Sequence, residues 1–195
     1  PDSEPIELAV ARYLGAPEDG ERPPLFYNLG GPGGGAVESL SAVVANIVTD
    51  QVAQAYIIVA LDPRGVGASS PIWCMTEEER DADNAREVDV ADMSLDERVA
   101  WNDAEIATIG NQCLERNGEI LGFVDSDSSA RDFDITRGVL GAETMDYLGF
   151  SYGTLLGAIY ADLFPDHVGR FVLDGVLDTA MNLNEVSAAQ IAGME

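Results

Sequence analysis

The sequence contains no lysine, and all 10 of its basic residues are arginine. A Walker-type phosphate loop, a pyridoxal Schiff base and a Ser–Lys dyad all need a lysine, so this chain can form none of them. The 35 acidic residues give a formal net charge of −25 at pH 7. Nucleic acids and anionic membranes are themselves negatively charged. We therefore expect no nucleic-acid partner and no membrane partner.

Long hydrophobic runs are also missing. No apolar stretch approaches the roughly 20 residues that a membrane-spanning helix needs. The first residues, Pro1 to Glu4, have neither the basic nor the apolar region of a signal peptide, so we expect the start to have been trimmed. We expect neither a cofactor nor a metal ion. With 195 residues, of which 46% are hydrophobic, one domain with a substantial core is predicted.

The most informative stretch is a serine flanked by glycines. An apolar run, Met145 to Phe150, predicts a buried strand and leads into Gly-Phe-Ser-Tyr-Gly, after which a helical pattern begins. This G-x-S-x-G pattern in a strand–turn–helix context is typical of a nucleophile elbow. Side chains at Gly149 and Gly153 would collide with the neighbouring strand and helix. Ser151 is therefore predicted to be a catalytic nucleophile; the alternative is a turn serine that caps a helix.

A second glycine cluster, Gly30 to Gly35, follows the predicted strand 25–29. It lacks the lysine of a phosphate loop and the spacing of a dinucleotide fingerprint. A glycine-rich loop between a strand and a helix exposes backbone N–H groups to a ligand. The cluster is thus predicted to supply half of an oxyanion hole. In the turn that follows the strand 56–61, Asp62 and Arg64 are predicted to tie the backbone by hydrogen bonds, not to act in catalysis.

The alternation of strands and helices predicts an α/β fold with a mostly parallel sheet covered on both faces. The expected strands are 6–13, 25–29, 56–61, 145–150 and 171–174. The expected helices are 36–53, 95–117, 129–140 and 151–164. Residues 1–178 are assigned to the core and 179–195 to the start of a helical lid region.

The acidic stretch 76–105 is predicted to be a solvated excursion. Within it, Ser94 and Glu97 form a capping box that opens a helix, and Gly118 stops that helix. The apolar spacing predicts a buried face on this helix, made of Leu95, Val99, Ile106, Ile109 and Cys113. Cys74 and Cys113 allow a single intrachain pairing, but their spacing leaves two free thiols equally open.

Together these motifs resemble an α/β-hydrolase, and more narrowly the secreted bacterial tripeptidyl-aminopeptidase and prolyl-aminopeptidase group. The motifs that carry the resemblance are residues 28–35, 61–67, 149–154, 160–165 and 173–176. The resemblance implies that Ser151 is the nucleophile and that the backbone N–H groups of Gly31 and Tyr152 form the oxyanion hole. It also implies export and a Cys74–Cys113 disulfide. Leu29 stands where many prolyl-aminopeptidases carry histidine. This departure from the family's pattern argues against narrow prolyl specificity.

The family's catalytic triad runs serine, aspartate, histidine. The single histidine here, His167, follows the elbow helix and is expected to be a solvated turn residue roughly 20 Å from the serine. Asp174 is expected to be structural. The chain is therefore predicted to be the N-terminal part of a hydrolase, with the last strands and lid incomplete. The acid and the histidine would come from a missing C-terminal half, present as a second chain.

Three functions remain open at this point. The first is a serine exopeptidase that releases N-terminal amino acids or short peptides. The second is a carboxylesterase of the same fold, because acyl transfer to serine has the same needs for esters and amides. The third is a non-catalytic, hydrolase-like binding domain. The expected substrate is a peptide or an ester, and the expected location is secreted or in the cell envelope, as a mature form without a signal peptide.

Overall fold

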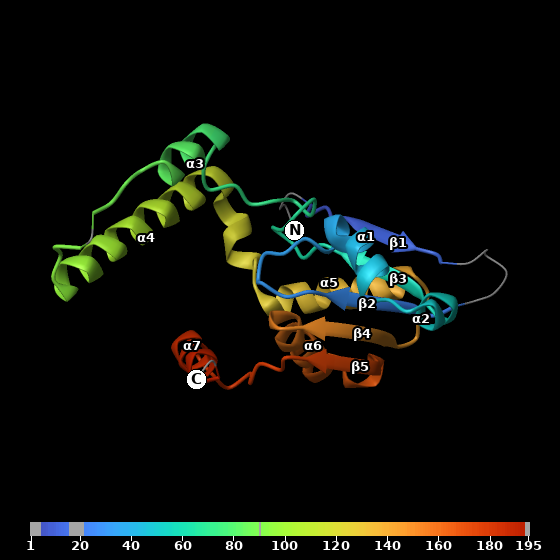
Figure 1. Ribbon diagram of the computed structural model, residues 1–195. Coiled ribbons are helices and arrows are strands. Elements are labelled where there is room, and N and C mark those ends of the chain that lie inside the picture. The colour runs from blue at the N-terminus through green and yellow to red at the C-terminus, as the bar shows by residue number, and fades with distance from the viewer. Residues whose placement is uncertain (1–4, 16–21, 90, 194–195) are drawn as a thin grey trace. The chain divides into compact units, whose positions relative to one another are not determined.

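A computed structural model describes residues 5–15, 22–89 and 91–193 (Figure 1). The chain divides into two compact units. One comprises residues 1–71 and 125–195, and the other comprises residues 72–124. No helix within the described ranges combines the length and the apolar character needed to cross a membrane.

The larger unit is built around a five-stranded sheet (Figure 1). Its strands are β1 (Val10–Tyr13), β2 (Pro24–Asn28), β3 (Ile57–Leu61), β4 (Met145–Phe150) and β5 (Val168–Asp174). Their order across the sheet is β1-β3-β2-β4-β5. β1 pairs antiparallel with β3, whereas β2, β3, β4 and β5 pair in parallel. The predicted, mostly parallel sheet is thus confirmed.

Helices cover both faces of this sheet. Alternate residues of each strand point to opposite faces, and apolar residues on both faces pack against helices. The helices of this unit are α1 (Ala36–Asn46), α2 (Asp50–Ala55), α5 (Ser126–Val139), α6 (Tyr152–Leu163) and α7 (Leu183–Ala192). Phe26 and Tyr147 belong to a buried cluster that includes Phe133 of α5 and Tyr160 of α6. The neighbouring Tyr27 belongs to a second cluster, which packs against α1.

The predicted helix 36–53 is wrong in one respect, because it is broken into two helices. α1 ends at Asn46, and α2 begins after Thr49, whose side chain accepts a hydrogen bond from the backbone N–H of Val52. A threonine in this position caps a new helix start. The apolar periodicity continues across the break, so it gave no sign of the interruption.

The smaller unit consists of α3 (Glu77–Asn84), α4 (Leu95–Asn117) and the 3-10 helix η1 (Gly118–Phe123). The predicted capping box of Ser94 and Glu97 is present, and Gly118 stops α4 with a φ of 61°. The acidic stretch was not predicted to contain α3. Its start carries the same signal, a capping box formed by Thr76 and Glu79.

The predicted buried face of α4 is wrong. Leu95 is 75% exposed and Ile106 is 60% exposed, and none of the described residues of this unit is buried. An amphipathic pattern predicts burial only if another element packs against the apolar side. Within this unit, a disulfide joins Cys74 to Cys113. The side-chain amide of Asn117 is hydrogen-bonded to the backbone N–H and carbonyl of Trp73.

The last described helix, α7, falls within the segment assigned to the start of a lid, and it belongs to the larger unit. The boundary between core and lid at residue 178 remains a prediction.

Candidate active site

Ser151 lies between β4 and α6 in a conformation that is uncommon for a residue with a side chain. Its φ is 50° and its ψ is −121°, and its backbone N–H donates a 3.0 Å hydrogen bond to the carbonyl of Asp174, at the end of β5. The residue is exposed, and its hydroxyl does not cap α6. A strained backbone of this kind is typical of functional turns, where it directs a side chain away from regular structure.

The two glycines of the elbow are required by close backbone contacts. A Cβ atom on Gly149 would lie 2.6 Å from the carbonyl oxygen of Gly153 in the first turn of α6. A Cβ atom on Gly153 would lie 2.4 Å from the carbonyl oxygen of Asn28, at the end of β2. Both collisions expected from the sequence, with the helix and with the neighbouring strand, are therefore found.

Two hydroxyl groups hold the turn in place, and no sequence motif pointed to either of them. Thr154 donates a 2.6 Å hydrogen bond to the carbonyl of Ser151 and accepts a 3.0 Å bond from the backbone N–H of Leu177. Tyr147 donates a 2.8 Å bond to the carbonyl of Gly153. Burial raises the pKa of Tyr147 well above its usual range, so this hydroxyl remains a donor.

The predicted oxyanion donors belong to segments that meet at the elbow. Gly30 has a φ of 96°, and a Cβ atom on it would lie 3.0 Å from the backbone nitrogen of Tyr152. The side chain of Asn28 accepts a 2.8 Å hydrogen bond from the N–H of Gly30 and so fixes the loop. Gly31 is the next residue along, with a φ of 117°. The loop therefore runs against the start of α6, where backbone N–H groups are free to bind an anion.

A pocket of about 530 Å³ opens beside the serine. It lies among the elbow, the chain that follows β5, and α7, and this volume is in the range of small-molecule sites. The described residues that line it are Ser151, Gly175, Val176, Leu177, Asp178, Met181, Val186, Ala189 and Gln190. Of these, Asp178 alone carries a charge. No sequence motif pointed to this aspartate.

Asp62 has the predicted structural role. Its carboxylate accepts hydrogen bonds from the backbone N–H groups of Val37, at 2.8 Å, and Ala68, at 3.0 Å. Arg64 forms a two-point ion pair with Asp132 of α5, with both contacts at 2.7 Å. The pair therefore joins the turn after β3 to a helix on the face of the sheet.

His167 lies after the far end of α6, as expected, in the short 3-10 helix Pro165–His167. Its side chain is 39% exposed, so it is partly solvated, but its Nδ1 also lies 2.7 Å from a carboxylate oxygen of Asp134, a contact that the sequence did not predict. Asp134 also accepts hydrogen bonds from Arg137 and Tyr160. α6 has 12 residues and is therefore about 18 Å long, so its two ends are too far apart for a hydrogen bond.

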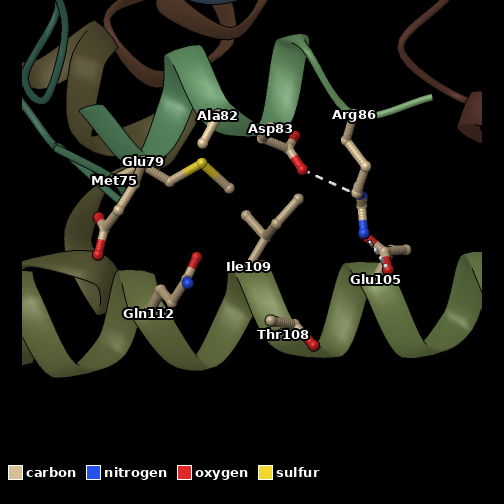
Figure 2. Close-up of a pocket in the computed structure, with 9 residues that line it drawn as sticks. All are labelled: Met75, Glu79, Ala82, Asp83, Arg86, Glu105, Thr108, Ile109 and Gln112. Carbon is tan, nitrogen blue, oxygen red and sulfur yellow. Dashed lines mark hydrogen bonds and ion pairs between the residues drawn. The ribbon is translucent and has the colours of Figure 1, made fainter. Parts of the chain in front are cut away.

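A second pocket, of about 350 Å³, lies in the unit 72–124 between α3 and α4 (Figure 2). Figure 2 shows Arg86 between Asp83 and Glu105. These carboxylates are already paired with a cation. The side-chain oxygen of Gln112 is buried there without a hydrogen-bond partner. The described residues that line this pocket include no serine and no histidine.

The carboxylates at the second pocket are not arranged as a metal site. Across the ranges that the structure describes, no group of three or more His, Cys, Asp or Glu residues is arranged to hold a metal ion.

The family model for the α/β-hydrolase fold matches residues 23–195. The chain belongs to the α/β-hydrolase family. A hydrolase from Pseudomonas aeruginosa PA01 has a similar structure, with a TM-score of 0.52 at 17% identity, covering 96% of this chain and 48% of that chain. At this level of identity, the likeness supports the fold alone.

Curated relatives of this α/β-hydrolase carry several functional names. A tripeptidyl aminopeptidase of Streptomyces coelicolor is 43% identical over 91% of this chain and 33% of its own length. The serine protease Hip1 of Mycobacterium tuberculosis is 33% identical over 100% of this chain and 37% of its own. Carboxylesterase B of the same species is 37% identical over the same shares, 100% and 37%. The chain thus spans about a third of the length of the relatives that it matches.

Proposed function

We propose that this α/β-hydrolase chain carries the nucleophile of a serine exopeptidase that releases N-terminal amino acids or short peptides. The observation that carries the proposal is the elbow itself. Ser151 presents an exposed hydroxyl on a positive-φ turn at the start of α6, and the Gly30–Gly31 loop runs alongside. The relatives named aminopeptidase and serine protease support the peptidase assignment.

In the proposed reaction, Ser151 Oγ attacks the carbonyl carbon of the substrate and loses its proton to a base. The resulting oxyanion accepts hydrogen bonds from the backbone N–H groups of Tyr152 and Gly31. Such donors stabilise charge that develops only in the transition state, and the loss of one costs about 10²–10³ in rate. The scissile bond then breaks, and the base gives its proton to the leaving amine, so the acyl group stays on Ser151. A water molecule that loses a proton to the same base attacks this acyl carbon, and the proton passes to Ser151 Oγ as the acid product departs.

The base and the acid of the triad are proposed to lie on polypeptide beyond these 195 residues. His167 is held by Asp134 at the far end of α6, so it cannot reach Ser151. The side chain of Asp174 is exposed, and its carbonyl is used by the turn. The relatives, which are about three times as long, have room for both groups. The proposed partner is accordingly the C-terminal half of the same enzyme.

The disulfide between Cys74 and Cys113 supports a secreted or cell-envelope location, since such bonds persist in oxidising compartments. The proposal includes neither nucleic acid nor membrane as a partner, because of the net charge of −25.

A carboxylesterase is the second candidate, favoured by the relative of that name. A single experiment on the full-length protein separates these candidates. The native protein is treated with a fluorophosphonate, its adduct is located by mass spectrometry, and turnover is compared between aminoacyl arylamides and short acyl esters.

An adduct on Ser151 and faster cleavage of the arylamides are expected. Ser151→Ala should lose both the adduct and all but a residual activity, a drop of roughly 10⁴-fold or more. Faster turnover of simple esters would favour the carboxylesterase. Absence of an adduct on Ser151 would indicate the non-catalytic binding domain and contradict the proposal.

A further inference from the structure

The pocket beside Ser151 has an asymmetric chemistry. Most of its lining is apolar, formed by side chains such as Val176, Met181 and Val186. Val176 and Met181 are 67% and 43% exposed, so apolar surface faces this hollow without cover from the described chain. Gly175 contributes no side chain next to the elbow, which leaves the space beside Ser151 open. An acyl group attached to Ser151 therefore has an apolar surface to lie on.

One carboxylate interrupts this apolar lining, and a local turn holds it in place. Oδ1 of Asp178 accepts a 2.9 Å hydrogen bond from the backbone N–H of Ala180. The backbone carbonyl of Asp178 accepts a 3.2 Å hydrogen bond from the backbone N–H of Met181. Among the residues that the structure describes, no arginine lines the pocket and none is paired with Asp178. One carboxylate oxygen therefore remains available to a ligand cation.

We propose that Asp178 binds the α-ammonium group of the substrate and so selects peptides with a free amino terminus. The proposal rests on Ser151 being the nucleophile, as set out above. In an exopeptidase that releases N-terminal residues, the acyl part of the substrate carries the amino terminus. The α-ammonium group must therefore be bound near the pocket that receives this part. A neutral ester has no such group, so a carboxylate here favours a peptide over a simple ester.

The variant that tests this is Asp178→Asn in the full-length protein. Asparagine keeps an oxygen at the position that accepts the Ala180 N–H, so the turn is retained while the charge is removed. The matched control is Asp162→Asn. Asp162 is exposed near the C-terminal end of α6, at the opposite end from Ser151, and its substitution removes one negative charge in the same way.

Each protein is assayed on two substrates that differ only at the amino terminus, a peptidyl arylamide with a free α-amine and its N-acetylated form. We expect Asp178→Asn to lower kcat/KM for the free amine by roughly 10- to 100-fold, the range for loss of a hydrogen bond to a charged group. The value for the acetylated substrate should stay within about twofold, as should the rate of fluorophosphonate labelling of Ser151. Asp162→Asn should change none of these values.

Two results would overturn the proposal. If Asp178→Asn lowers kcat/KM for both substrates and the labelling rate to the same extent, Asp178 is only structural. If Asp178→Asn leaves kcat/KM unchanged for both substrates while the wild type is active, the amino terminus is bound elsewhere. Failure of the proposed function has a different signature, because the wild type itself would then show no adduct on Ser151 and no turnover of either substrate.

Discussion

At the residue scale, the elbow is shaped by backbone atoms that approach one another more closely than any Cβ atom would allow. Gly153 packs its Cα against Asn28 of β2, and Gly149 packs against Gly153. These contacts draw α6 onto the sheet and leave Ser151 in its left-handed conformation. The geometry of the candidate site thus depends on missing side chains as much as on present ones.

Gly153→Ala tests this dependence. Replacement of a helical glycine by alanine ordinarily stabilises a protein by about 0.5–1 kcal/mol. Here the new methyl group would lie 2.4 Å from a backbone oxygen, so the free energy of unfolding should instead fall by about 2 kcal/mol or more. Gly138→Ala is the control, because a Cβ on this α5 residue meets nothing within 4 Å. Urea unfolding of both variants provides the measurement, and stabilisation by Gly153→Ala would contradict the packing described.

A second residue-scale feature is the carboxylate of Asp134, which is 17% exposed. Burial by itself would raise the pKa of Asp134, but hydrogen bonds from Arg137, His167 and Tyr160 outweigh burial and hold the pKa below its usual range. A group whose pKa is lowered by folding contributes stability above its unfolded pKa of about 3.9, and this contribution is lost as the pH falls through the folded value.

Asp134→Asn should therefore reduce the free energy of unfolding by about 1–3 kcal/mol at pH 7. The difference from wild type should shrink as the pH falls below about 4, where the wild-type carboxylate also becomes protonated. Urea titrations at a series of pH values measure this difference. The exposed Asp162→Asn serves as the charge control. A difference that stays constant down to pH 2 would show that the ionised form is not what stabilises the cluster.

At the scale of elements, α3 and α4 show that helix signals and burial are separate matters. Both helices begin with complete capping boxes, formed by Thr76 with Glu79 and by Ser94 with Glu97. Capping satisfies free backbone N–H groups locally and needs no tertiary partner. No described residue of the unit 72–124 is buried, so it lacks an apolar core of its own. The Cys74–Cys113 bond is therefore its strongest internal constraint.

Replacement of both cysteines by serine should loosen this unit selectively. The bond closes a loop with a sequence separation of 39, for which the chain-entropy relation gives a stabilisation of up to about 4 kcal/mol. In limited proteolysis of the native protein, new cleavage sites should appear within residues 72–124, while cleavage in the sheet-containing unit stays unchanged. Equal protection of the unit in the double variant would show that α3 and α4 hold together without the bond.

At the scale of the whole molecule, the sheet ends in an apolar strand. Among the described residues, β5 pairs with β4 on one side only, and Val172 within it is 58% exposed. An exposed apolar edge strand can pair with another chain, which leads to aggregation. This arrangement supports the proposal that a further strand from the C-terminal half covers β5.

Residues 1–195 expressed alone should therefore aggregate and show no turnover, and co-expression with the C-terminal half should restore both solubility and activity. Val172→Lys should reduce light scattering of the isolated segment, because a charge on an edge strand opposes pairing. Val139→Lys is the control. Val139 is 80% exposed at the end of α5, so this substitution adds the same charge away from the edge strand. A soluble, active wild-type segment, or equal effects of both lysines, would contradict this explanation.

The amino-acid sequence by itself determined the fold class, the order of the five strands along the chain and the local shape of the elbow. These features follow from short-range physics. The contact of Gly149 with Gly153, the capping box at Ser94 and the stop at Gly118 all act within a few residues. Alternating strands and helices then leave few arrangements other than a parallel sheet with helices on both faces.

Only the tertiary structure decided which surfaces are buried and which distant groups meet. The spacing of Leu95 and Ile106 predicted a buried face, but burial needs a partner that no single helix encodes. His167 meets Asp134, and Arg64 meets Asp132, across many residues of chain. Asp178 reaches the pocket of Ser151 because β5 and the chain after it pass beside the elbow. Contacts between distant segments depend on how the sheet is assembled, and local sequence patterns do not contain that information.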